Sequence, residues 1–309
     1  MSDPLLREAR AAIARGSKSF ALAARLFDAP TRARATLLYA WCRYCDDVTD
    51  EQELGMGFLG RPGTIHERVA MLRAETHAAL NGGRPRGLPF AALRRVADET
   101  GLPERYAMDL IHGFEMDAEE PFYRSAADTL GYCYHVAGCV GVMMAIVMGV
   151  APANRPTLER ACDLGLAFQL NNIARDVVED AARGRCYLPA QWLADADIEP
   201  GEEAKPWARE RLARVVARLV DEAERYEASA RVGAAALSFR SAWAVLAAAE
   251  IYGAIGRKVR RAGPRAWDRR IGTSRMEKLL LVARARRAAA RRATDLAPTA
   301  RDGLWTMPA

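Results

Sequence analysis

Apolar and polar positions follow helical rather than strand spacing along most of the chain, and proline and glycine separate the helical stretches. Alanine, arginine and leucine abound while runs of β-branched residues are scarce, a balance that favours helix over strand. The pattern predicts an all-α protein with loops at 55–63, 81–89 and 197–206. The predicted helices cover residues 4–15, 31–51, 64–80, 88–100, 104–118, 125–150, 156–183, 204–231, 238–262 and 274–294.

None of the glycine- and proline-rich segments is long enough to be a clear domain linker. We therefore expect one all-helical domain over residues 1–309, with the basic region 257–301 as part of it. Residues 129–154 contain no charged side chain if His135 is neutral, and 136–151 is almost wholly apolar. A membrane-spanning helix needs about 20 apolar residues. This run is shorter, so we expect a buried core helix.

The charge distribution is uneven along the chain. Residues 257–301 hold fifteen Lys or Arg and only three Asp or Glu, although the net charge of the whole chain is +6. Such a region could bind an anionic lipid surface or substrate, or form a solvated arginine-rich helix face around 284–292. No recognition motif and few aromatic residues accompany it, so we expect no nucleic-acid partner.

The six cysteines show no spacing typical of a disulfide framework, and the chain opens on a polar helix rather than a secretory signal. We therefore expect reduced thiols and a cytoplasmic protein. Cys42 and Cys45 form a single C-x-x-C, but no second pair or histidine follows at zinc spacing. Both are expected to be small buried hydrophobic residues.

Two acidic motifs carry the candidate chemistry. Asp46 and Asp50 lie four residues apart on one predicted helix, as do Asp176 and Asp180 on another, so each pair shares a helix face. Like charges at this spacing repel by ~0.2–0.5 kcal/mol, and aspartate is a poor residue for a helix interior. A hard divalent cation would compensate, and Mg²⁺ prefers one or two carboxylates together with water and substrate phosphates. The motifs predict metal ions shared with a phosphorylated substrate.

The second motif extends into a longer stripe. Asn172 precedes Asp176 by four residues, and successive members rotate by only about 40° around the helix, so the three side chains stay on one side. Gln169 lies on the same side, and Arg175 is adjacent to Asp176. Near the first motif, Arg43 could equally form an ordinary surface ion pair with a neighbouring aspartate. Both motifs together favour a metal site over a purely structural arrangement.

Residues 55–60 match the dinucleotide-binding pattern G-x-G-x-x-G by letters alone. That site needs a strand before it and a helix after it, whereas here an acidic helix precedes and Arg-Pro-Gly follows. No P-loop, H-E-x-x-H or G-x-S-x-G occurs either. We reject a dinucleotide site and expect no NADPH.

The chain resembles the squalene/phytoene synthase family of head-to-head prenyl transferases, in particular its bacterial phytoene-forming members. Five segments carry the resemblance in family order: 16–20 (GSKSF), 39–50, 132–138 (YCYHVAG), 169–180 and 184–189 (GRCYLP). The resemblance implies an isoprenoid-synthase-type helical bundle around a central apolar cavity and a site for three Mg²⁺ ions, for which Mn²⁺ can substitute. It also implies a prenyltransferase of carotenoid biosynthesis, which condenses two geranylgeranyl diphosphates through prephytoene diphosphate to phytoene.

The resemblance also implies roles for individual residues. Where the family pattern has threonine, this chain has Asn171, a departure that affects only the surroundings of the metal site. Metal ions are expected at Asp46, Asp50, Asn172, Asp176 and Asp180; diphosphate oxygens at Ser17, Lys18, Ser19, Arg43, Arg175 and Arg269; and the cavity lining at Phe20, Tyr39, Tyr132, Val136, Gly138, Gln169 and Tyr252.

Several alternatives stay open at this point. A C30 dehydrosqualene or squalene synthase would use farnesyl diphosphate, and chain length depends on a cavity depth that sequence does not measure. A head-to-tail prenyltransferase would repeat D-D-x-x-D where this chain has D-V-V-E-D, and a terpene cyclase has a comparable N-x-x-x-S-x-x-x-E stripe. A helical membrane-surface protein would explain the basic region but not two acidic motifs. Because the expected substrate and product are strongly hydrophobic, we expect peripheral contact with the inner membrane face and with neighbouring isoprenoid-pathway enzymes.

Overall fold

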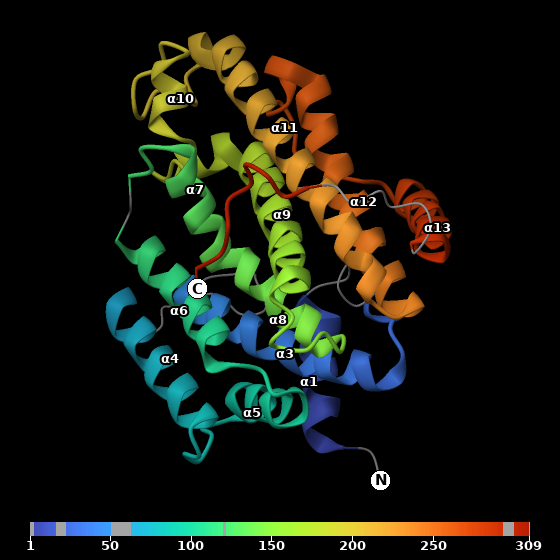
Figure 1. The fold of residues 1–309 in the computed structure, drawn as a ribbon. Helices are drawn as coiled ribbons and strands as arrows, with labels where there is room; N and C mark the ends of the chain where they lie inside the picture. The colour runs from blue at the N-terminus through green and yellow to red at the C-terminus, as the bar shows by residue number, and fades with distance from the viewer. Residues whose placement is uncertain (1–2, 17–22, 51–62, 120–121, 293–299, 309) are drawn as a thin grey trace.

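The computed structural model describes residues 3–16, 23–50, 63–119, 122–292 and 300–308. These residues form helices joined by loops, with no strand among them (Figure 1). The helices are α1 (Pro4–Gly16), α3 (Ala29–Thr49), α4 (Ile65–Leu80), α5 (Leu88–Thr100), α6 (Glu104–Ala118), α7 (Ala126–Cys133), the π-helix η1 (Tyr134–Gly138), α8 (Cys139–Val147), α9 (Arg155–Ala181), α10 (Ala190–Ala194), α11 (Arg209–Gly233), α12 (Phe239–Ala262) and α13 (Arg275–Arg291), with 3₁₀ turns η2 (Pro206–Ala208), η3 (Ala234–Ala236) and η4 (Gly263–Arg265).

Local signals define where the site-bearing helices begin. Asp28 accepts a hydrogen bond from the backbone N–H of Thr31 at 2.8 Å and so caps α3. Asn154 accepts from the N–H of Thr157 and caps α9 in the same way. Both helices therefore begin within two residues of their predicted starts.

Helix α9 runs through the middle of the bundle, beside α8, α11 and α12 (Figure 1). Glycines permit its close approach to the preceding helix. A Cβ on Gly165 would lie 2.3 Å from the carbonyl oxygen of Ala137, and one on Gly141 would lie 2.4 Å from that of Ala161. Because the two backbones touch, the acidic stripe of α9 is fixed relative to the residues of α7 and η1.

The predicted apolar helix 125–150 is a continuous rod of α7, η1 and α8 with a π-helical turn in its middle. Within the part of the chain that the structure describes, residues 126–147 are long and apolar enough to span a membrane, yet 56% of the most apolar window is buried inside the bundle. This placement is that of a core helix. Single π-helical turns inside helices are frequent at functional sites.

The C-terminal segment 300–308 returns across the bundle, a feature that the sequence pattern did not predict (Figure 1). Arg301 pairs with the fully buried Asp163 at 2.8 Å, and Tyr226 accepts a hydrogen bond from the N–H of Trp305 at 3.0 Å. The short helix α10 was also not predicted. One connected set of buried hydrophobic residues extends from Ala9 to Met307, so both ends of the described chain join the same core.

The six cysteines are free, as the sequence predicts. Burial raises the pKa of Cys42 to about 12 and that of Cys45 well above its ordinary value, so both carry neutral thiols. They are small apolar residues of α3 rather than metal ligands.

Candidate active site

The first acidic motif lies at the C-terminal end of α3. Arg43 pairs with Asp46 at 2.9 Å and with the buried Asp47 at 3.0 Å, so one guanidinium serves two carboxylates. Asp50 caps the end of the helix. Desolvation raises the pKa of Asp46 to about 6, although Arg43 opposes the shift, and repulsion from Asp50 adds to it. The ion pair between Arg43 and a neighbouring aspartate, which the sequence left open as an alternative to a metal site, is therefore present. The motif nevertheless has more carboxylates than arginines.

The second motif lies at the C-terminal end of α9. Arg175 donates from Nε to Asp176 Oδ1 at 2.8 Å and from its Nη2 to the other oxygen. Arg270, from the loop after α12, pairs with Asp176 at 3.1 Å and also with Glu179. Desolvation, reinforced by repulsion from Asp176, raises the pKa of Asp180 to about 6.

Arg185 connects the two motifs electrostatically. Its charge lowers the pKa of Asp50 on the first motif and of Asp180 on the second, against the desolvation that raises both. Its backbone N–H donates to the carbonyl oxygen of Asp180 at 3.0 Å, which places it directly after α9. Since one cation acts on both motifs, the two acidic helix ends border the same space.

The donor set fits divalent cations. The side chains of the two motifs offer oxygen atoms, the ligands that Mg²⁺ and Mn²⁺ prefer. Among the described residues, no three Asp, Glu, His or Cys side chains lie close enough to form a ready-made cage. A cage is not expected, because Mg²⁺ usually takes one or two carboxylates and completes its shell with water and substrate phosphates. Desolvation, with a smaller contribution from neighbouring aspartates, raises the pKa of Asp46 and Asp180, and a bound cation would favour their ionised forms.

Asp117, at the end of α6, was not predicted as a site residue. The hydroxyl groups of Tyr132 and Tyr187 donate to its two carboxylate oxygens at 3.3 and 3.2 Å. These two rings stack with centroids 4.8 Å apart, and Tyr123 lies 5.3 Å from Tyr132. Desolvation raises the pKa of Asp117, while Arg185 acts in the opposite direction. A half-buried carboxylate and three tyrosines therefore form a wall beside the first motif.

The segment 184–189 holds this wall in place. The N–H of Ala190 donates to the carbonyl oxygen of Tyr123 at 2.9 Å, and the hydroxyl of Thr129 donates to that of Tyr187 at 3.0 Å. The family resemblance includes this segment but implies no role for Arg185 or Tyr187. The available signal was the position of Arg185 five residues after Asp180, directly after Gly184, a glycine with positive φ in the turn that follows α9.

The other predicted cavity-lining residues that the structure describes lie on α3, η1, α9 and α12. Tyr252 stacks on Phe168 at 4.2 Å and lies near enough to Arg175 to raise the pKa of that guanidinium. Gln169 accepts from the amide of Asn172 at 3.4 Å. Of the other residues predicted to line the cavity, Tyr39 lies near Arg43 on α3. Val136 and Gly138 lie on η1.

Gly138 and Arg269 have surroundings that differ from the predicted ones, and some predicted residues lie outside the described chain. Gly138 packs against α9, where an added Cβ would lie 2.9 Å from the sulfur of Cys162, so this glycine also serves helix packing. Arg269 is exposed, and its neighbour Arg270 is the residue that pairs with Asp176. The predicted residues Ser17, Lys18, Ser19 and Phe20 lie outside the described residues, as does the glycine motif at 55–60.

Asn171, the departure from the family pattern, faces away from the acidic stripe. Its side-chain amide donates to the carbonyl oxygen of Ala167 at 2.8 Å, and its own oxygen is buried without a hydrogen-bond partner. That oxygen points at Gly256 of α12, where an added Cβ would lie 1.7 Å away. Asn171 therefore belongs to the packing of α9 on α12.

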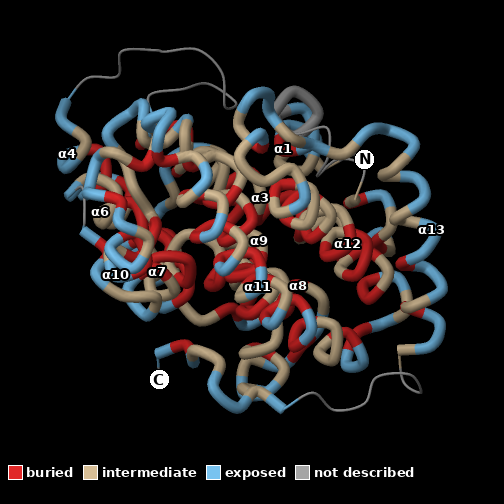
Figure 2. Tube along the Cα trace, turned by 90° about the horizontal axis from the view of Figure 1, so that it is seen from above, coloured by how far each residue is buried: buried red, intermediate tan, exposed pale blue. Residues whose placement is uncertain are grey.

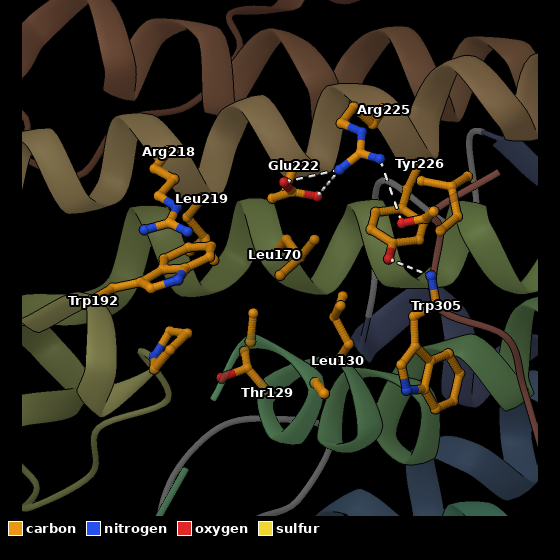
Figure 3. Close-up of a pocket in the computed structure, with 15 residues that line it drawn as sticks. Thr129, Leu130, Leu170, Trp192, Arg218, Leu219, Glu222, Arg225, Tyr226 and Trp305 are labelled. Carbon is orange, nitrogen blue, oxygen red and sulfur yellow. Dashed lines mark hydrogen bonds and ion pairs between the residues drawn. The ribbon is translucent and has the colours of Figure 1, made fainter. Parts of the chain in front are cut away.

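A pocket of about 420 Å³ lies between α7, α9, α11 and the C-terminal segment (Figure 3). Trp192, Leu130 and Leu170 give it apolar walls, and Arg218 lies over the Trp192 ring at 4.1 Å. No residue of either acidic motif lines this pocket, so it is separate from the acidic site.

Comparisons with known proteins identify the family of the chain. The family model for squalene/phytoene synthase matches residues 13–277. A 15-cis-phytoene synthase from Pantoea ananas is 47% identical, with 100% of both chains covered. A second 15-cis-phytoene synthase, from Paracoccus sp., is 50% identical over 100% of this chain and 99% of the relative.

Solved structures support the same fold. A crystal structure of a dehydrosqualene synthase in complex with ligand matches with a TM-score of 0.80 and 25% identity, covering 92% of this chain and 95% of that chain. The isoprenoid-synthase-type helical fold predicted from the sequence is confirmed. Because the family match and the full-length relatives agree, the chain belongs to the squalene/phytoene synthase family and is a prenyltransferase.

Proposed function

We propose that the protein condenses two geranylgeranyl diphosphates head to head, through prephytoene diphosphate, to phytoene, with release of two diphosphates. The observation that carries the proposal is the pair of acidic helix ends that border one space around Arg185. Relatives named phytoene synthase match at 47–50% identity over their full length, which supports this reading over the C30 alternative. Membership of the family sets aside the head-to-tail prenyltransferase, the terpene cyclase and the non-enzymatic protein.

Divalent metal ions are proposed to bind at Asp46, Asp50, Asn172, Asp176 and Asp180, with Mg²⁺ as the physiological ion and Mn²⁺ as a substitute. Bound there, they would neutralise the diphosphate leaving group as its bond to C1 breaks. The helical spacing of these oxygen donors supports the assignment, as does the repulsion from Asp50 and Asp176 that adds to desolvation in raising the pKa of Asp46 and Asp180.

Arginine side chains would bind the remaining diphosphate oxygens. Arg43 and Arg175 each lie against a carboxylate of their own motif, so a bound diphosphate would meet fixed N–H donors beside the acids. Arg185 stands between the motifs and is proposed as a further donor. Preorganised donors of this kind stabilise the charge that develops on a leaving group.

The tyrosine wall would protect the cationic intermediates. An allylic cation is attacked by the 2,3-double bond of the second substrate, which gives a cyclopropyl intermediate that retains one diphosphate. Rings such as Tyr132 can stabilise positive charge through their faces and exclude water. Asp117 accepts a hydrogen bond from the Tyr132 hydroxyl and thereby holds the Tyr132 ring in place. Released diphosphate or a water held by a tyrosine would take the final proton.

We also propose that the chain acts as one domain and needs no NADPH. One connected core and the packing of α13 on α12 support the single domain. A cytoplasmic location at the inner membrane face, contact with neighbouring isoprenoid-pathway enzymes and the absence of a nucleic-acid partner stay predictions.

Product analysis tests this function. Purified protein with Mg²⁺ is given geranylgeranyl or farnesyl diphosphate, with and without NADPH, and hydrocarbons and released diphosphate are measured. We expect a C40 conjugated triene and two diphosphates per product, independent of NADPH. A higher kcat/KM for farnesyl diphosphate with a C30 product would contradict the proposal.

A further inference from the structure

The outer face of α13 carries three exposed apolar side chains within one turn. Met276, Leu279 and Leu280 are 66%, 60% and 67% exposed. Residues three and four apart share a helix face, so these side chains form one patch. The other large exposed hydrophobic residues of the described chain are Met71, Phe122 and Trp207, each on a different element. Single exposed apolar residues are ordinary, whereas a contiguous patch marks an interaction surface.

The helix that carries the patch is firmly attached from its inner side. Ala285 and Ala289 are fully buried, and the indole N–H of Trp243 on α12 donates to the carbonyl oxygen of Val282 at 2.8 Å. Ser274 and Glu277 form a capping box at the start of α13. The patch is therefore a fixed outward surface, and Figure 2 shows α13 at the edge of the molecule with many exposed residues.

Positive charge surrounds the apolar turn. Helix α13 has six Lys or Arg and a single acid, Glu277, which pairs with Lys258 at 2.6 Å. Arg275 is exposed beside Met276, and the exposed residues Arg286 and Arg287 follow along the helix. An apolar turn flanked by arginines is complementary to a bilayer, which has a hydrocarbon interior and, where anionic lipids are present, negatively charged headgroups.

We propose that the outer face of α13 docks the protein on an anionic lipid bilayer. Met276, Leu279 and Leu280 would insert among the headgroups, and the flanking arginines would contact anionic lipids. The inference goes beyond the proposed reaction and does not depend on it, although a lipid substrate and product are consistent with it.

A second copy of the chain fits this face less well. A symmetric dimer through α13 would bring the same patch from both subunits together. It would oppose two clusters of exposed arginines, whereas the cores of protein interfaces are depleted of charge. Charge complementarity therefore favours the bilayer.

Co-sedimentation with vesicles, without substrate, tests the docking. We compare vesicles of phosphatidylcholine alone with vesicles containing phosphatidylglycerol. The triple variant Met276→Ser, Leu279→Ser, Leu280→Ser should bind the anionic vesicles about a thousandfold more weakly, from about tenfold for each of the three inserted side chains. Arg286→Gln with Arg287→Gln should weaken binding by roughly 20-fold on anionic vesicles and little on neutral ones.

Trp207→Ser is the matched control, because it removes an exposed apolar side chain from another element. It should bind like the parent protein. Full binding by the triple variant, or equal binding of the parent to both kinds of vesicle, would overturn the proposal. So would a vesicle-free dimer that the triple variant dissociates, because α13 would then be a self-association face.

Turnover in detergent micelles separates this proposal from the enzymatic one. In detergent micelles the triple variant should turn over substrate at the rate of the parent protein, although it no longer binds vesicles. A parent protein that binds vesicles through α13 but forms no C40 product would leave the docking supported and the proposed reaction refuted.

Discussion

Two clusters of carboxylates in this protein receive different amounts of positive charge. Between α11 and α12, Glu227 and Glu250 are only 5% and 4% exposed, and both pair with Arg231, at 2.6 and 3.0 Å. Arg257 adds a further ion pair to Glu227 at 3.2 Å. Each buried acid of this cluster has an arginine partner within hydrogen-bond distance, and the cluster needs no ligand.

The acidic site is short of cations by comparison. Asp50 and Asp180 make no ion pair within the described residues, and desolvation raises the pKa of both. Arg43 divides its charge between two aspartates, and Arg185 acts on several acids at once. Asp50 is exposed and Asp180 is half-buried, and neither has the arginine partner that each buried acid of the first cluster has, so both carboxylates are open to a ligand from outside. We therefore expect stability and function to depend on different carboxylates.

The largest expected effect concerns the unpaired set. Asp180→Asn should lower turnover about a thousandfold, because a metal ligand contributes several kcal/mol to neutralising the leaving group. It should not lower the melting temperature of the metal-free protein, since it removes a repelling charge. Diphosphate release and thermal melting of the same preparation give both values. Near-normal turnover at saturating Mg²⁺ would make the metal assignment wrong.

The paired cluster should respond in the opposite way. Glu227→Ala leaves Arg231 and Arg257 without their closest partner, and breaking a buried ion pair costs about 3–5 kcal/mol of unfolding free energy. Chemical denaturation measures this loss. Glu222→Ala, which removes an i,i+3 surface pair with Arg225, should change stability by less than about 1 kcal/mol and is the control. Equal losses for both variants would remove the distinction between paired and unpaired acids.

The tyrosine wall lies between these extremes. Asp117→Asn should lower kcat about 10- to 100-fold, the range for residues that orient a functional group, with a small change in KM. Asp109→Asn is a matched control because Asp109 also accepts a tyrosine hydroxyl, that of Tyr134. It should cost stability but little turnover of the folded enzyme. If both variants lose kcat equally, Asp117 has only a general packing role.

The helices were predictable because their signals are local. The predicted range 104–118 matches α6 at both ends, since Pro103 precedes it. The predicted helix 204–231 began too early, because η2 and its surrounding turns fill residues up to 208. The π-helical turn and the return of segment 300–308 depend on contacts between distant residues, such as Arg301 with Asp163, and no local pattern encodes them.

The acidic site was predictable to the extent that it repeats a helical spacing. Asp46, Asp50, Asp176 and Asp180 share faces that the sequence displays directly. Asp117 was missed because its partners, Tyr132 and Tyr187, lie 15 and 70 residues away and form no motif with it. Sequence spacing finds ligands on one helix, whereas residues that orient others are found only after folding.

Solution pH should change the charge of two aspartates of the acidic site, Asp46 and Asp180. The pKa of Asp46 and Asp180 is raised from 3.8 to about 6, so the stability that each contributes is present below pH 4 and lost as the pH rises through 6. Because the Asp46 side chain is 41% exposed, solvent screens it, and about 1 kcal/mol is expected for that residue. Melting in EDTA between pH 4 and 8 measures this loss. Mg²⁺ with diphosphate should restore stability at pH 7, since metal binding needs ionised carboxylates. A pH profile in EDTA that Asp46→Asn leaves unchanged would contradict the assignment.

The smallest expected effect distinguishes two neighbouring arginines. The family resemblance assigns a diphosphate contact to Arg269, whereas the structure pairs Arg270 with Asp176 and Glu179. Arg270→Gln should raise KM for the prenyl diphosphate about threefold, because a half-exposed ion pair that orients Asp176 is worth less than about 1 kcal/mol. Arg269→Gln, on an exposed residue of the same loop, is the matched comparison. A larger KM effect at Arg269 would restore the family assignment and leave Arg270 as a structural partner of α9.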